Sequence, residues 1–210
     1  MEWKDIITLI LGWGLGLLSP LILDKINKKS KSKELKECIF IELDELKILL
    51  AMLRFNLETK YNTLSMELID SLIPIFENTK AINNTGKTLG VLKNFKNYSH
   101  EDFKKAVEHY KTPGSLSVKK LDLPFLKSKI QELDIFNIDL QRQLLDINYM
   151  LDLYNRQVEE CKFYYKMTFD GNISDQNHSI VTESLKQIYL QISDRVKILI
   201  DRIESVRNNK

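Results

Sequence analysis

Cysteine, proline and glycine are scarce in this chain of 210 residues, which contains 2, 4 and 7 of them. No stretch rich in proline, glycine or serine divides the residues after the first 24, so we expect them to form one domain. Cys38 and Cys161 both lie on apolar helical stripes. The sequence therefore predicts two buried thiols and no disulfide.

Recognisable catalytic motifs are also missing. No Ser/His/Asp, Cys/His or Glu-x-x-His arrangement stands out by its spacing. The segment Asn84–Thr88 resembles the end of a phosphate loop, but the first glycine and a preceding strand are missing. His100 and His109 lie nine residues apart and point in different directions on a helix. We therefore predict that the protein is not an enzyme and holds no metal or cofactor; a site assembled from distant residues is the alternative.

Neither sign of charge is in large excess, because 31 lysines and arginines face 29 aspartates and glutamates, a net charge of +2. Five lysines form one short cluster, which consists of Lys25, Lys28, Lys29, Lys31 and Lys33. Without this cluster the chain is slightly acidic, which argues against a nucleic-acid partner. We expect the cluster to contact anionic membrane lipids, each lysine contributing about 1 kcal/mol near the surface.

What the chain does have is one long apolar run. Residues 6–23 include no charged side chain, and eighteen to twenty helical residues extend roughly 27–30 Å, about the hydrocarbon thickness of a bilayer. A signal peptide would need a positive start and a small-residue cleavage site, and the run has neither. A buried helix of a soluble core is the alternative, but it would leave five lysines beside that core. The sequence therefore predicts a transmembrane helix.

The lysine cluster follows the apolar run, which orients the predicted helix. Lysines beside a span stay on the cytoplasmic side, so the amino terminus is expected outside. The chain then divides into a transmembrane anchor at 1–24, a lysine-rich juxtamembrane segment at 25–33 and a cytoplasmic bundle at 34–210. Abundant lysine, isoleucine and asparagine are typical of an AT-rich bacterial genome. The predicted location is therefore a bacterial inner membrane.

Small residues in the apolar run are candidates for self-association. Gly12 and Gly16 stand in the small-xxx-small relation that lets two membrane helices approach closely. Pro20 lacks an N–H and crowds a carbonyl of the preceding turn, which predicts a bend. Ser32 can cap a following helix, so the segment Asn27–Ser32 is expected to be a hinge.

Apolar periodicity predicts helix in most of the remaining chain. Apolar residues repeat at steps of four and three from Ile39 to Leu57, and others, including Ile41 and Leu49, widen this seam towards several neighbours. Pro74 lies in the next apolar segment and either opens a helix or kinks one. A further helix is expected from His100, because Ser99 begins a sequence typical of a capping box.

The most regular seam lies in the last third of the chain. It runs from Leu140 to Tyr165, turns at 170–175 and returns from Leu185 to Val206. Two helices about 45 Å long, joined by a short loop, form an antiparallel pair. A shorter helix is expected to start at Pro124, with either a kink or a break at Asn137. The predicted fold is all-α, with a bundle of long antiparallel helices.

Aromatic residues gather at the predicted turn of this hairpin. Phe163, Tyr164 and Phe169 lie beside lysines, a combination that can contact a protein partner. The leading functional hypothesis is a single-pass membrane-anchored protein whose bundle binds a protein partner or itself at the cytoplasmic membrane face. The alternative is a homo-oligomeric, membrane-perturbing effector of a bacterial stress or phage-defence response. A sensor of a small ligand is a third and weaker hypothesis.

Overall fold

The computed structural model describes the backbone of residues 3–61, 63–77, 85–110 and 117–208. Within the first helix it describes the side chains of Trp3 and Trp13, but not those of residues 4–12 and 14–22. All elements in the described ranges are helices, and these ranges contain no strand. The prediction of an all-α fold with a helical bundle is confirmed.

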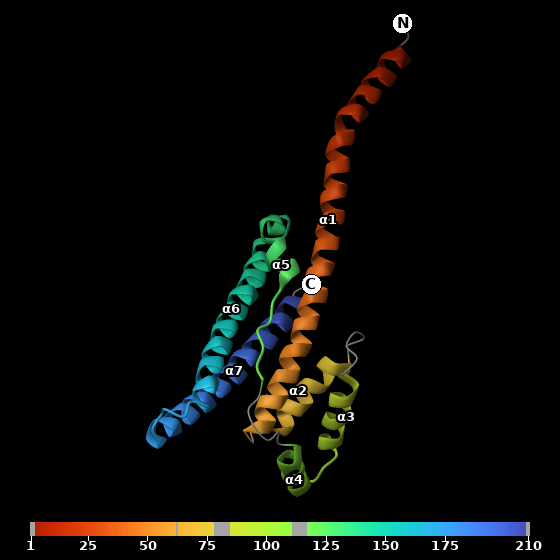
Figure 1. The fold of residues 1–210 in the computed structure, drawn as a ribbon. Coiled ribbons are helices and arrows are strands. Elements are labelled where there is room, and N and C mark those ends of the chain that lie inside the picture. Colours follow the sequence, from red (N-terminus) through yellow and green to blue (C-terminus); the bar gives the residue numbers. More distant parts are fainter. Residues whose placement is uncertain (1–2, 62, 78–84, 111–116, 209–210) are drawn as a thin grey trace.

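The first helix, α1, runs without interruption from Trp3 to Lys60. Its amino-terminal half extends beyond the rest of the molecule (Figure 1), and the first described side chain buried in the core is Leu35. The predictions of a hinge at Asn27–Ser32 and of a helix cap at Ser32 are wrong, because α1 passes through both. This segment contains no glycine or proline, and its three lysines favour helix.

Two side-chain contacts support helix through the lysine-rich segment. Ser30 Oγ donates to Glu34 Oε1 at 3.2 Å, and Lys33 Nζ lies 3.9 Å from Glu37 Oε1. Both pairs are four residues apart, the spacing at which side chains meet on one helix face. The lysine-rich segment is therefore a continuation of α1.

Among the described residues, no helix is long and apolar enough to cross a membrane. The side chains of residues 4–12 and 14–22, on which the predicted span at 6–23 depends, lie outside the described set. The side chain of Pro20 and the predicted self-association residues Gly12 and Gly16 fall in these ranges. The transmembrane prediction is therefore not confirmed, and it stays a prediction.

The long helices α6 (Ile138–Met167) and α7 (Asp175–Asn208) form the predicted antiparallel hairpin. α7 packs along α6 on one side and along the carboxyl-terminal half of α1 on the other. The regular seam of α6 is buried from Leu140 to Cys161, whereas Tyr165, its last predicted member, is exposed. The four-three spacing of apolar residues therefore identified both helices and the face that they bury.

Three short helices surround the carboxyl-terminal end of α1 (Figure 1): α2 (Met66–Glu77), α3 (Thr85–Lys96) and α4 (His100–Tyr110). Pro74 lies inside α2 and does not begin a new helix. The predicted cap at Ser99 is confirmed, since Ser99 Oγ accepts from the Asp102 N–H at 3.2 Å and donates to Asp102 Oδ2 at 2.7 Å. The start of the segment that resembles a phosphate loop lies outside the described residues, and Thr85–Thr88 form the first turn of α3.

A strap of chain, residues 117–136, connects this group to the hairpin. It contains the short helix α5 (Pro124–Ser128) and the 3-10 helix η1 (Ile130–Ile135). Asn137 Oδ1 then accepts a hydrogen bond from the Leu140 N–H at 2.8 Å and caps α6. The chain therefore breaks at Asn137 instead of kinking.

The predicted widening of the α1 seam is confirmed in part. Phe40, Ile48 and Phe55 are buried as predicted, but Ile41 and Leu49 are exposed. Cys38 was also predicted to be buried and is exposed. The neighbours of α1 cover only part of its circumference, so one apolar-rich face is left in solvent. Cys161 is buried as predicted.

The two cysteines are expected to react at different rates with a maleimide. Cys38 is exposed, whereas burial restricts access to Cys161 and raises the pKa of its thiol, which lowers the reactive thiolate fraction at neutral pH. Mass spectrometry of the folded protein should find one rapid modification, at Cys38, and two after denaturation. Rapid double labelling of the folded protein would contradict the packing of α6.

Candidate functional site

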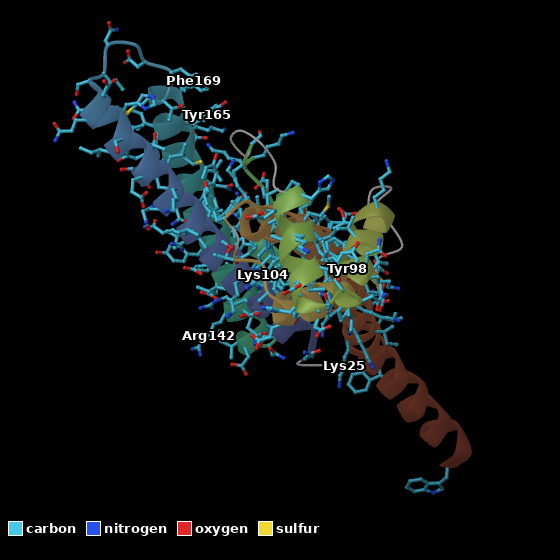
Figure 2. The ribbon with its side chains drawn as sticks, turned by 90° about the horizontal axis from the view of Figure 1, so that it is seen from below. Lys25, Tyr98, Lys104, Arg142, Tyr165 and Phe169 are labelled. Atoms are coloured by element: carbon cyan, nitrogen blue, oxygen red, sulfur yellow. The ribbon has the colours of Figure 1, made fainter. Side chains whose placement is uncertain are left out.

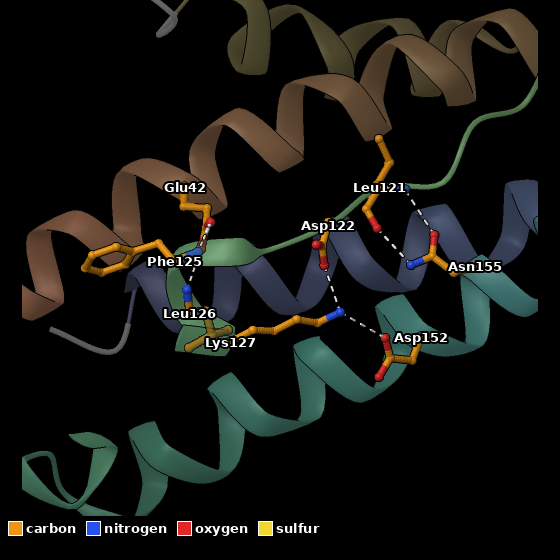
Figure 3. Close-up of polar contacts among 8 residues, drawn as sticks. All are labelled: Glu42, Leu121, Asp122, Phe125, Leu126, Lys127, Asp152 and Asn155. Atoms are coloured by element: carbon orange, nitrogen blue, oxygen red, sulfur yellow. Dashed lines mark hydrogen bonds and ion pairs between the residues drawn. The ribbon is translucent and has the colours of Figure 1, made fainter. Parts of the chain in front are cut away.

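The strap lies between α1 and α6, and side chains from both helices hold its backbone (Figure 3). Its own apolar side chains enter the core, namely those of Val118, Leu123, Leu126, Leu133 and Phe136. It fills the space between two helices that both pack on α7. The strap is the one long irregular connection of the described chain.

Glu42 of α1 anchors the start of α5. Its Oε1 accepts from the Phe125 N–H at 2.7 Å and its Oε2 from the Leu126 N–H at 2.9 Å. The residue before α5, Leu123, provides no side-chain cap. Amide groups of a first helical turn have no partner within their own helix, and a carboxylate also interacts favourably with the helix dipole. Glu42 therefore acts as a cap supplied from a distant part of the chain.

Residues of α6 hold the other end of the strap. Asn155 Oδ1 accepts from the Leu121 N–H at 3.0 Å, and Asn155 Nδ2 donates to the Leu121 carbonyl at 2.8 Å. The hydroxyl of Tyr154 donates to the Lys119 carbonyl at 2.7 Å. Burial raises the pKa of Tyr154, which keeps this donor protonated. Together, Glu42, Tyr154 and Asn155 form a polar clamp on the strap backbone.

Ion pairs surround the clamp at the surface. Lys127 Nζ lies 2.8 Å from Asp122 Oδ1 and 3.4 Å from Asp152 Oδ1. The hydrogen bond from Lys127 lowers the pKa of Asp122. These side chains are well exposed, so each pair is expected to add at most about 1 kcal/mol. The clamp binds backbone groups of its own chain, and its arrangement supports a structural role, not a catalytic one.

The lysine cluster is exposed as a whole, but two members have acidic partners. Lys31 Nζ lies 2.9 Å from Glu132 Oε2 of η1, and Lys33 pairs with Glu37. Lipid binding by this cluster stays a prediction. Within the described ranges, no group of three or more His, Cys, Asp or Glu side chains is arranged to hold a metal ion.

The predicted partner-contact residues lie at the turn of the hairpin, but not on one face. The rings of Phe163 and Tyr164 pack edge to face, with centroids 5.4 Å apart, and those of Tyr165 and Phe169 do the same at 5.1 Å. Phe163 and Tyr165 are two residues apart, so they point to opposite sides of α6. These four residues form an aromatic tip, whose Tyr165 and Phe169 are labelled in Figure 2.

A shallow groove of about 390 Å³ lies beside Tyr164 at this tip. Ile180 and Ile188 of α7 line it with apolar surface, and Glu160 and Glu183 add acidic groups. Ile180 is exposed. The sequence did not draw attention to this groove, because its apolar residues come from two helices and belong to no single motif.

A second groove, of about 640 Å³, lies between α4 and the start of α2. Phe103, Val107 and Leu64 contribute its apolar lining, and Lys104 and Lys105 are among its charged residues.

Comparison with known proteins yields no relative: no protein-family model, no curated protein and no solved structure matches the chain. Its candidate sites therefore rest on the geometry above.

The clamp can be tested by replacing Glu42 with alanine. This change leaves two amide groups at the start of α5 without their acceptor, so we expect the free energy of unfolding to fall by about 1–3 kcal/mol. Glu45→Ala is the matched control, because Glu45 is exposed on the same helix, and its effect should stay within about 0.5 kcal/mol. Chemical unfolding followed by circular dichroism gives both values, and equal effects would contradict the clamp.

Proposed function

We propose that the chain is a membrane-anchored helical protein that holds a protein partner, or further copies of itself, at the cytoplasmic membrane face. The observation that carries this proposal is the continuity of α1. One end of this helix is the apolar run at 6–23, and the other end is built into the bundle core from Leu35 onwards. A single helix would thus join anchor and bundle without a flexible linker.

The spacing along α1 supports this division of roles. Leu35 lies twelve residues after Leu23, so the core begins roughly 18 Å beyond the apolar run. Lys25, Lys28 and Lys29 occupy the intervening length and would meet lipid headgroups. Charge effects decline over about 8 Å at physiological ionic strength. The first lysines would therefore interact with lipid most strongly, and Lys31 and Lys33 would serve mainly in their ion pairs.

The aromatic tip supports recruitment of a protein. It lies at the end of the hairpin remote from the amino-terminal end of α1 (Figure 1), where a bound partner would not meet the membrane. Exposed aromatic side chains are enriched at protein interfaces because they bury much area with few rotatable bonds. The acidic groove beside Tyr164 favours a partner that presents apolar and basic side chains.

A membrane-perturbing effector is the alternative function. Gly12 and Gly16 would pack several spans together, and a continuous α1 would transmit association of the bundles to those spans. In that case the protein that each chain binds at the membrane is another copy of itself. The effector differs from the anchoring protein in the consequence of association, because gathered spans would perturb the membrane.

Deletion of residues 1–24 tests the anchor. The full-length protein is expected to resist extraction from membranes by alkaline carbonate, whereas the shortened protein should be soluble. It should also keep its helical circular dichroism, because every described side chain of the core lies at or beyond Leu35. A shortened protein that is unfolded, or that still sediments with membranes, contradicts the separation of anchor and bundle.

Loss of the aromatic tip should abolish partner capture. In cells that carry tagged full-length protein, crosslinking and affinity capture are expected to recover a stoichiometric protein, and the variant Phe163→Ser/Phe169→Ser should lose it. Tyr149→Ser removes an exposed aromatic ring of α6 outside the tip and serves as the control. Recovery of self-crosslinked copies alone would favour the effector, and capture that survives the double change would rule out the tip.

A further inference from the structure

One corner of the bundle reaches further along α1 towards its amino-terminal end than any other part. This corner, residues 129–142, comprises η1 and the start of α6, and it stands beside the projecting half of α1 (Figure 1). Its position matters if residues 6–23 span a membrane, because the corner is then the part of the bundle nearest to the lipid surface. The inference below rests on the proposed function.

An ion pair fixes the position of the corner along the axis of α1. Lys31 Nζ lies 2.9 Å from Glu132 Oε2, and Lys31 follows Leu23 by eight residues, or roughly 12 Å of helix. The headgroup layer of one leaflet is about 5–7 Å thick, which is half the difference between a whole bilayer and its hydrocarbon core. The side chains at the outer end of the corner therefore come close to this layer if α1 stands upright, and a moderate tilt towards α6 brings them into it.

The side chains at the corner suit the boundary between lipid and water. Ile130 and Ile138 are exposed, although they are large and apolar. Arg142 projects outwards one turn further along α6 (Figure 2). Apolar side chains next to an arginine are typical of segments that lie in the headgroup region.

The acidic groups at the corner determine whether electrostatic attraction or apolar burial would dominate its binding to lipid. Lys129 and Lys31 bond to Glu132 and lower the pKa of its carboxyl, so this charge is paired. Asp134 and Asp139 are exposed and offset Arg142. The corner therefore has little net charge, and burial of isoleucine is its main source of attraction to lipid.

We propose that this corner is a second membrane contact, in which Ile130 and Ile138 enter the headgroup layer and Arg142 meets lipid phosphate. Two contacts, one through the anchor and one through the corner, fix the tilt of the bundle. The aromatic tip is then held at the far end of the hairpin, facing away from the lipid. A bundle attached through α1 alone would change its tilt whenever the anchor, as part of the same helix, tilts in the bilayer.

Three exposed positions allow a controlled test in the full-length protein. The side chains of Ile26, Ile138 and Tyr149 are 57%, 56% and 56% exposed. Ile26 lies three residues after the apolar run, and Tyr149 lies on α6 eleven residues, or roughly 16 Å, beyond Ile138. Each is replaced by cysteine in a Cys38→Ser background and labelled with a small environment-sensitive fluorophore. Circular dichroism verifies that each variant is folded.

The labelled proteins are inserted into vesicles of phosphatidylcholine and phosphatidylglycerol in equal parts, with a nitroxide quencher on the lipid headgroup. We expect strong quenching at positions 26 and 138, and several-fold weaker quenching at position 149. Quenching at 26 alone would overturn the second contact while leaving the anchor intact. Equal quenching at 138 and 149 would also overturn it, because the hairpin would then lie flat on the surface. No quenching at any position would refute the anchor itself.

Discussion

The continuity of α1 is the constraint on which the other features depend. One helix carries the uncharged run at its start and a buried seam at its end, and the chain between them has no glycine or proline at which to bend. The position of the bundle relative to residues 6–23 is therefore set by helix geometry. The lysine cluster, the corner and the aromatic tip each have a defined place along this axis.

The bundle is held together by α7, which packs on both α1 and α6, while the strap fills the remaining space between these two helices. Ion pairs reinforce the contact of α7 with α1, since Asp44 pairs with Arg207 and Lys47 with Glu204. The strap has too little regular structure to satisfy its own backbone groups. Glu42, Tyr154 and Asn155 satisfy several of them, so buried polar contacts complement the apolar seams.

The sequence was sufficient to predict what depends on local periodicity. The hairpin of α6 and α7 and the cap at Ser99 follow from the spacing of a few neighbouring residues. The clamp could not be predicted, because Glu42 and Phe125 lie 83 residues apart and share no motif. The exposure of Ile41 and Cys38 depends on which neighbours cover α1, which periodicity does not determine. The predicted hinge is wrong because serine, although favoured at helix caps, costs less than about 1 kcal/mol inside a helix, so Ser32 does not force a break.

The most direct test of this account is a distance measurement along α1. Spin labels at Leu23 and Leu49, both exposed, flank the lysine cluster and are separated by 26 residues. A continuous helix places them about 39 Å apart. In the full-length protein without Cys38, double electron–electron resonance should give a narrow distribution near this distance. A broad or clearly shorter distribution would reveal a hinge, and the fixed arrangement of anchor, corner and tip would then be wrong.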